Sequence, residues 1–298
     1  MIGELNDLDA TFESIVSTNL ADSYNGIFND SNIPLDVVFV SAPKDFETLI
    51  YSVTSVKQYL QQPISRIALI APKSNAAIEI SQSLGMEYID ENTILSHKDF
   101  TDWTRENKLS HNCRQCTWSW YYQQFLKLLY YKTTKAENYF VIDADIVMNK
   151  PFTLISNDGV RTFFTGHNSG HEISKISVQL LLGEEQYVPE FSFIADLMCF
   201  NKNIVEGMIT QIEKKFNLEF YKAAILVEQA SKARFSEYEM YGVYVNFNND
   251  LASSRQLTNY IPLPPKTNCT RKRSTLGLDQ LSNELKICHY LAYHYWFN

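Results

Sequence analysis

The sequence predicts an α/β fold in which a mostly parallel central sheet lies between two layers of helices. Apolar runs of strand length at residues 36–42, 66–72 and 86–90 alternate with segments of helical periodicity, which is the spacing of β-α-β units. A fourth run, Tyr139–Ile142, is apolar throughout, as is typical of a strand buried on both faces. With 298 residues, 45% of them hydrophobic, the chain can bury one large core or two closely joined ones.

The other elements follow from local patterns along the chain. Apolar side chains at helical spacing over residues 9–20 predict an amphipathic helix, within an N-terminal extension of residues 1–33. Helical periodicity after the first strand continues to Leu60. The remaining expected elements are helices over residues 74–84, 118–132 and 203–216, and strands over residues 161–165 and 191–200.

Composition narrows the classes of function. The formal net charge of -8 disfavours a general nucleic-acid-binding surface. No apolar stretch approaches the roughly 18 residues of a membrane span, and the start of the chain lacks a signal-peptide pattern, so we expect a cytoplasmic protein. Five cysteines, an odd number, favour reduced thiols. His111, Cys113 and Cys116 are an alternative, partial zinc site without a second closely spaced pair of ligands.

Two carboxylates directly follow the apolar run Tyr139–Ile142. Asp143 and Asp145 are separated by one small residue, and alternate side chains of a strand point to one side, so we expect these carboxylates about 7 Å apart on one face. Such a pair can share a divalent cation that also carries a diphosphate. The alternative is that the aspartates only end the strand before Pro151. We favour metal binding because that alternative explains one acid more easily than two.

Further polar residues follow the first strand and lie on the helix predicted over residues 118–132. Ligands of parallel α/β sheets bind beyond the carboxyl ends of strands, where Ser41 and Asp45 are expected. No G-x-G-x-x-G or P-loop pattern opens a helix, which disfavours a Rossmann dehydrogenase or a P-loop NTPase. Trp120, Gln124 and Lys127 share a helical stripe that could hydrogen-bond a sugar or phosphate. The alternative for this stripe is a solvated face.

Residues 235–242 carry the signals of a helix start. Ser236 and Glu239 have the spacing of a capping box, which gives Glu239 a structural reason to be present. Glu237, in the first helical position, gains only the weaker interaction with the helix dipole. Glu237 is therefore the better candidate for a catalytic carboxylate, and the alternative is a simple first-turn acid.

Four more residues are candidates for a site. His167 lies in a Gly- and Ser-containing loop and could be a ligand or an acid/base group. Asp196 is a single charge inside an apolar strand pattern, and we expect it to face a site or to be paired internally. His289 and His294 lie in the aromatic C-terminal segment, where one of them could reach the aspartate pair as a third metal ligand. The alternative for either is a histidine at the edge of the core.

Three of these motifs together resemble the nucleotide-sugar-dependent glycosyltransferases of the GT-A fold. They are Asp143-Ala-Asp145, the helix segment 118–127 upstream, and residues 236–242. The resemblance covers about residues 36–244. Together, the three motifs are similar to those of a branch of these enzymes associated with bacterial, and some viral, surface-polysaccharide synthesis. It implies a GT-A-like three-layer α/β/α sandwich, with residues 34–298 as one catalytic domain. In that domain, residues 34–150 would bind the nucleotide and residues 151–298 the acceptor.

The resemblance also implies roles for the candidate residues. It implies Mn²⁺ or Mg²⁺ coordinated directly by Asp145, with Asp143 contacting the metal or the donor ribose and His289 or His294 completing the metal shell. It also implies Glu237 as the base of an inverting reaction. Together with the positions argued above, the expected donor-binding residues are Ser41, Asp45, Trp120, Gln124, Lys127 and Asp143. The expected acceptor-binding residues are His167, Asp196 and Glu239. The donor would be a nucleotide sugar, with a UDP-sugar expected first, and the acceptor a glycan or glycolipid. Peripheral association with the inner membrane face and the oligomeric state stay open.

Two other functions are compatible with the same residues. A sugar-phosphate nucleotidyltransferase also uses paired acids and a metal, but such enzymes usually need a glycine-rich phosphate loop, which Ser41–Asp45 lacks. A non-catalytic glycan-binding protein on the same fold would use its aromatic residues, 13% of the chain, to stack on sugars. A retaining transferase would need no base, so the prediction of inversion depends on Glu237.

Overall fold

The structure is a computed structural model that describes residues 31–109, 117–148, 150–165, 172–183 and 192–247, and the backbone of residues 258–262 and 290–292. Several predicted features lie outside the described residues. They are the N-terminal helix over residues 9–20, the partial zinc site of His111, Cys113 and Cys116, and the candidate residues His167, His289 and His294.

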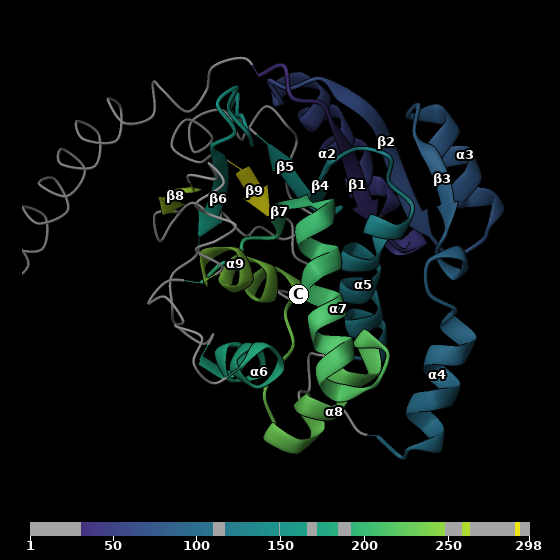
Figure 1. The fold of residues 1–298 in the computed structure, drawn as a ribbon. Helices are drawn as coiled ribbons and strands as arrows, with labels where there is room; N and C mark the ends of the chain where they lie inside the picture. The colour runs from purple at the N-terminus through teal and green to yellow at the C-terminus, as the bar shows by residue number, and fades with distance from the viewer. Residues whose placement is uncertain are drawn as a thin grey trace, which may run out of the picture.

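Among the described residues, a five-stranded sheet forms the centre of the molecule, in the order β3-β2-β1-β4-β7 (Figure 1). The four parallel neighbours are β1 (Leu35–Val40), β2 (Ile64–Ala71), β3 (Glu87–Asp90) and β4 (Asn138–Ile142). The fifth strand, β7 (Leu197–Asn201), runs antiparallel to β4. The predicted α/β class with a mostly parallel sheet is confirmed.

Helices cover both faces of this sheet and make three layers (Figure 1). Alternate residues of β1 point to opposite faces. Val37 and Phe39 pack in a cluster with α2 (Phe46–Tyr59) and α3 (Asn75–Ser83). Val38 and Val40 belong to a second cluster on the other face. That cluster includes residues of α4 (His97–Glu106), α5 (Trp118–Leu129), α6 (Glu172–Leu182), α7 (Lys202–Phe216), α8 (Phe220–Ser231) and α9 (Glu237–Phe247).

Side chains cap the starts of the predicted helices α3 and α5, whereas α2 has no side-chain cap. Ser74 Oγ accepts a hydrogen bond from the amide of Ala77 at the start of α3, and Thr117 Oγ1 accepts one from Trp120 at the start of α5. The predicted strand over residues 191–200 is shorter than expected, because regular pairing begins only at Leu197. Asp196, just before it, has a φ of 60° and turns the chain into the strand.

Two short strand pairs lie beside the central sheet. β5 (Ile146–Met148) pairs antiparallel with β9 (Tyr290–Ala292), and β6 (Arg161–Thr165) pairs in parallel with β8 (Thr258–Pro262). The first pair brings a C-terminal segment next to the residues that follow Asp145. None of the helices in the described ranges is both long enough and apolar enough to span a bilayer.

Gly242 in α9 is expected to tolerate no side chain. A Cβ here would lie 2.2 Å from Cγ of the buried Phe193 ring, so Gly242→Ala should lower the free energy of unfolding by about 1–3 kcal/mol. Gly207→Ala in α7 is the matched control, because the nearest atom, the Tyr244 hydroxyl, would lie 3.7 Å away. The control should gain up to about 1 kcal/mol from helix propensity. Equal urea-unfolding curves for the two variants would contradict the close packing of α9.

Candidate active site

The polar residues predicted after β1 and β4 lie at one edge of the sheet. The two strands are parallel neighbours, with Val38 opposite Val141. Their carboxyl ends, and the residues that follow, therefore reach the same edge. This is the edge at which open α/β sheets bind ligands.

Asp143 and Asp145 occupy a turn and not a strand, and this turn is called the aspartate turn below. β4 ends at Ile142 and β5 begins at Ile146, whose amide donates to the carbonyl of Asp143 (3.1 Å). The prediction that the two carboxylates alternate along a strand was wrong in its geometry. The chain turns here because β4 pairs within the central sheet whereas β5 pairs with β9.

Lys127 of α5 connects Asp143 to Glu237. Lys127 is 3% exposed, and its ammonium lies 2.6 Å from Oδ1 of Asp143 and 2.7 Å from Oε1 of Glu237. It also donates to the hydroxyl of Tyr238 (3.1 Å), which in turn donates to Oδ1 of Asp143 (3.2 Å). These four residues are called the Lys127 cluster below. Because a buried charge is costly unless it is paired, the contacts within the cluster depend on one another.

Burial and the charges of the Lys127 cluster shift the pKa values of its members. Burial raises the pKa of Asp143 to about 6; Lys127 opposes this shift, and Asp196, Asp145 and Glu237 add to it. Burial by itself would lower the pKa of Lys127, but Asp143 and Glu237 more than offset burial and raise it above its ordinary value. The ammonium is therefore charged at neutral pH and holds both acids.

Glu237 is the first residue of α9, as the capping pattern predicts. Ser236 Oγ accepts a hydrogen bond from the amide of Glu239 (3.3 Å). The amide of Glu237 donates to Oε1 of Gln124 on α5 (3.3 Å). Glu237 is only 2% exposed. If Glu237 is the base, the acceptor hydroxyl has to reach this buried carboxylate.

Glu239 has a structural role in place of the expected contact with an acceptor. Its side chain is completely buried, and Oε2 accepts hydrogen bonds from Ser192 Oγ (2.9 Å) and the amide of Phe193 (2.8 Å). Burial raises the pKa of Glu239, and these two hydrogen bonds oppose the shift. The carboxylate therefore ties α9 to the segment before β7 and does not line a surface open to solvent.

The predicted stripe on α5 divides between two environments. Gln124 and Lys127 are buried and face Glu237, so the alternative of a solvated face is wrong for both. Trp120 is half-buried and lines a cavity. From Trp120 to Lys127 the helix advances by about 10 Å. α5 therefore connects this cavity to the Lys127 cluster.

The cavity lined by Trp120 has a volume of about 420 Å³ and is called the β1–β3 cavity below. Its lining includes Ser41 and Asp45 after β1, Pro72 after β2 and Glu91 after β3. Three of the predicted donor-binding residues, Ser41, Asp45 and Trp120, are thus brought together. Asp143 follows β4, which neighbours β1 in the sheet, so it belongs to the same sheet edge as Ser41 and Asp45.

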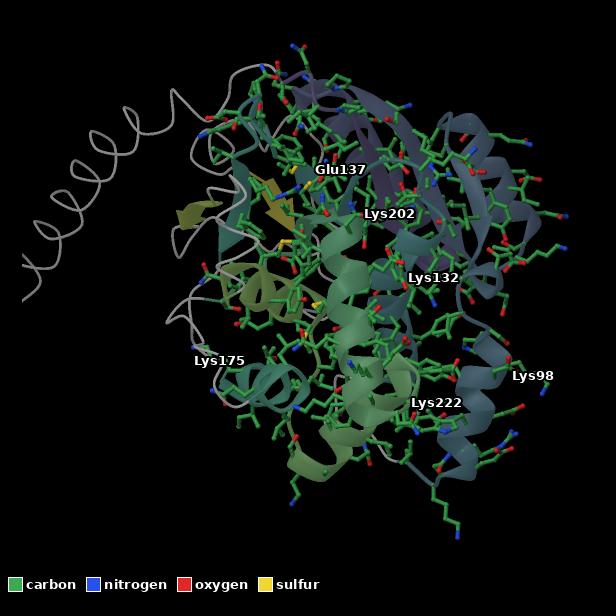
Figure 2. The ribbon with its side chains drawn as sticks, viewed as in Figure 1. Lys98, Lys132, Glu137, Lys175, Lys202 and Lys222 are labelled. Atoms are coloured by element: carbon green, nitrogen blue, oxygen red, sulfur yellow. The ribbon has the colours of Figure 1, made fainter. Side chains whose placement is uncertain are left out.

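A second cavity, also of about 420 Å³, is lined by residues of α4 and α8. Lys222 of α8 reaches toward α4 (Figure 2), with Nζ 5.9 Å from the ring centroid of Trp103. Lys222 also forms an ion pair with Glu219. No residue of the Lys127 cluster and no predicted site residue lines this cavity.

The sequence pattern of a protein family of unknown function, DUF6492, matches residues 44–274. The chain belongs to this family. All four residues of the Lys127 cluster lie inside the region that matches DUF6492, and so does Asp145. A comparison with curated proteins finds no match.

Solved structures with a partial likeness to this DUF6492 chain are distant. Mouse xyloside xylosyltransferase 1, in its apo form, is 9% identical, with 89% of this chain and 99% of that chain covered, at a TM-score of 0.44. Galactosyltransferase LgtC in complex with donor and acceptor sugar analogs is 12% identical, with 87% of each chain covered, at 0.43. Glucosyl-3-phosphoglycerate synthase from Mycobacterium tuberculosis, in complex with Mn²⁺, UDP and glucosyl-3-phosphoglycerate, is 11% identical, with 86% and 76% covered, at 0.39. TM-scores this low do not decide a function.

The DUF6492 site includes residues that sequence reasoning missed. Tyr238 joins the Lys127 cluster, and its only sequence signal is its place directly after Glu237. Glu91 lines the β1–β3 cavity and could have been found as the acid after the third strand. Asp196 was predicted, and the structure places it beside the aspartate turn: its carbonyl accepts a hydrogen bond from the amide of Asp143 (3.0 Å).

The chemistry of the aspartate turn fits a divalent cation such as Mn²⁺ or Mg²⁺. Carboxylate oxygens are preferred ligands of these ions, and Mg²⁺ is often held by one or two carboxylates together with substrate phosphates. Asp145 and the second oxygen of Asp143 would hold the ion, because Lys127 contacts the first. Within the described part of the chain, no three His, Cys, Asp or Glu residues gather closely enough to hold a metal by themselves. Additional ligands would come from phosphate, water or the C-terminal segment.

Proposed function

We propose that this DUF6492 protein is a metal-dependent glycosyltransferase that moves a sugar from a nucleotide-sugar donor to a hydroxyl group of a glycan or glycolipid. The observation that carries this proposal is the Lys127 cluster. It joins Asp143 of the aspartate turn to Glu237 at the start of α9, at the ligand-binding edge of the sheet and near the β1–β3 cavity. The resemblance to GT-A enzymes supports surface-polysaccharide synthesis as the setting.

The residues of the site would divide the reaction between them. A bound divalent cation would stabilise the negative charge that develops on the leaving nucleoside diphosphate. Glu237 would accept the proton of the acceptor hydroxyl as that oxygen attacks the anomeric carbon, and this single displacement would invert the carbon. Lys127 would fix the orientation of Glu237 and offset its repulsion with Asp143. Asp196, beside the turn, would contact the acceptor.

The register of β5 and β9 favours one of the two C-terminal histidines as a metal ligand. Ala292 lies opposite Ile146, the residue directly after Asp145, whereas Tyr290 lies opposite Met148. His294 follows Ala292 in the chain by two residues, and His289 directly precedes Tyr290. The end of β9 that leads to His294 is therefore the end nearer to Asp145, and we assign the third protein ligand to His294.

The test of this function begins with a panel of sugar nucleotides and Mn²⁺, measured by thermal unfolding. A ligand at 100 times its dissociation constant should add about 2.7 kcal/mol to the free energy of unfolding. Donors that stabilise the protein are then incubated with glycan acceptors, and release of nucleoside diphosphate is measured. We expect release that depends on both acceptor and metal.

Two outcomes of the same assays would assign the competing functions. Pyrophosphate release from nucleoside triphosphate and sugar phosphate, without turnover of sugar nucleotides, would indicate a nucleotidyltransferase. Glycan binding without stabilisation by any sugar nucleotide would indicate a non-catalytic binding protein. Either result would contradict the proposed transferase.

A further inference from the structure

Glu91 is a half-buried carboxylate in the wall of the β1–β3 cavity. It begins the short helix η2 (Glu91–Thr93), directly after β3. Among the described residues, no side chain or amide donates a hydrogen bond to its carboxylate. Burial, with a further contribution from Asp90, raises the pKa of Glu91 to about 7. The carboxylate is thus partly removed from water and, within the part of the chain that the structure describes, has no hydrogen-bond donor to compensate for that removal.

The distance of Glu91 from Asp143 suits the length of a nucleotide. β3 lies three strands from β4 in the order β3-β2-β1-β4, and neighbouring strands are about 4.8 Å apart, so Glu91 lies on the order of 14 Å along the sheet edge from Asp143. This is comparable with the length of an extended nucleoside diphosphate. If the diphosphate lies at the aspartate turn, the base lies in the β1–β3 cavity near Glu91.

The ionised form of Glu91, which predominates above its pKa of about 7, discriminates between nucleobases. Guanine presents an N1–H and an N2 amino group side by side, and these two donors match the two oxygens of one carboxylate. Uracil presents a single N–H between two carbonyl oxygens, which would face the negative charge. Adenine and cytosine each present an amino group beside a ring acceptor. Charge-assisted hydrogen bonds are about twice as strong as neutral ones, so the two-donor edge has a clear advantage.

The other acid of the cavity is in a different state. Lys44 lies 3.8 Å from the carboxylate of Asp45, so that carboxylate already has a cation near it. Gln123 is also occupied in part, because its amide nitrogen donates to the carbonyl of Val40 (2.8 Å). Of the two acids that line the β1–β3 cavity, Glu91 is therefore the one whose two oxygens a nucleobase with two N–H donors would engage.

We propose that Glu91 is a specificity-determining residue that reads the base of the donor and selects guanine, so that the donor is a GDP-sugar and not the UDP-sugar that the resemblance implies. This inference rests on the proposed function, because it places a nucleotide in the β1–β3 cavity. It adds to that function the identity of the base and the residue that recognises it.

The test is the affinity of the full chain for GDP, UDP, CDP and ADP in the presence of Mn²⁺, measured by isothermal titration calorimetry at pH 8, where Glu91 is mostly ionised. The wild-type protein should bind GDP at least about tenfold more tightly than UDP, because a site built for two donors rejects a base that lacks one. Glu91→Gln should reverse or abolish this preference, because the glutamine amide offers one donor and one acceptor and so suits uracil. Glu79→Gln, which removes a negative charge from an exposed position of α3, is the matched control and should leave the preference unchanged.

The outcomes separate this inference from the proposed function. Tighter binding of UDP than GDP by the wild type, or an unchanged preference in Glu91→Gln, would overturn the role of Glu91 and leave the transferase intact. Failure of all four nucleotides to bind the wild type would overturn both.

Discussion

Replacing Glu237 with glutamine is expected to lower kcat by roughly 10²–10⁴-fold, because the side chain keeps its size but can no longer accept a proton. The fold should persist, since the glutamine amide oxygen can still accept a hydrogen bond from Lys127, and Lys127 keeps its contact with Asp143. Initial rates at saturating sugar nucleotide and acceptor, together with the melting temperature, measure the two effects separately.

Glu239→Gln is the matched control for this variant. It changes a buried acid two residues further along α9 that contacts Ser192 and Phe193 and not Lys127. It should lower the melting temperature but largely keep kcat. If Glu237→Gln kept kcat within a few-fold of the wild type, Glu237 would not be the base. Retention of configuration would then become the better hypothesis.

Replacing Lys127 with methionine is expected to lower the free energy of unfolding by about 3–5 kcal/mol, the usual effect of removing one partner from a buried ion pair. Methionine fills much of the same space but leaves Glu237 and Asp143 without their shared cation. Urea unfolding followed by tryptophan fluorescence measures the loss. Lys44→Met is the control, because Lys44 has a 58% exposed side chain and lies 3.8 Å from Asp45; it should lose about 0–1 kcal/mol. Equal losses would contradict the buried cluster.

The pH dependence of the same variant follows from Asp143. Its pKa is raised from 3.8 to about 6, so between these values the folded state binds more protons than the unfolded state. The contribution of Asp143 to stability therefore falls as pH rises from about 4 to about 6 and stays at its lower value above that range. Lys127 opposes this shift, and its removal should make the loss of stability larger at pH 8 than at pH 5. A loss independent of pH would contradict the assigned contact.

The sheet could be predicted from the sequence because its signals are local. The apolar runs that became β1, β2 and β4 lack charges except at their ends, and the Ser236 cap marks the start of α9 within one residue.

The helices α4, α6 and α8 were not predicted. α4 is mostly polar, with Phe100 as its buried apolar residue, so its amphipathic pattern is short. Seven residues of α8 are buried, and Glu228 is one of them. Its buried residues therefore extend around much of the helix circumference.

The site was only partly predictable because its main contacts are distant in the chain. Lys127 and Glu237 are 110 residues apart, and no local periodicity indicates that they meet. The alternative of a solvated face for Lys127 was reasonable from the helix pattern alone, since charged residues are rarely buried without a partner. The strand geometry assumed for Asp143 and Asp145 failed for a similar reason: the turn depends on pairing of β5 with β9, more than 140 residues later.

The central claim is that the aspartate turn holds a divalent cation that carries the diphosphate of a sugar donor. Crystals of the full chain grown with Mn²⁺ and a nucleoside diphosphate, measured at a wavelength where manganese scatters anomalously, test it directly. We predict an anomalous peak that places manganese within coordination distance of Asp145 and of phosphate oxygens, with the nucleoside in the β1–β3 cavity. A nucleotide bound elsewhere, or one bound in that cavity with no peak beside Asp145, would contradict the account.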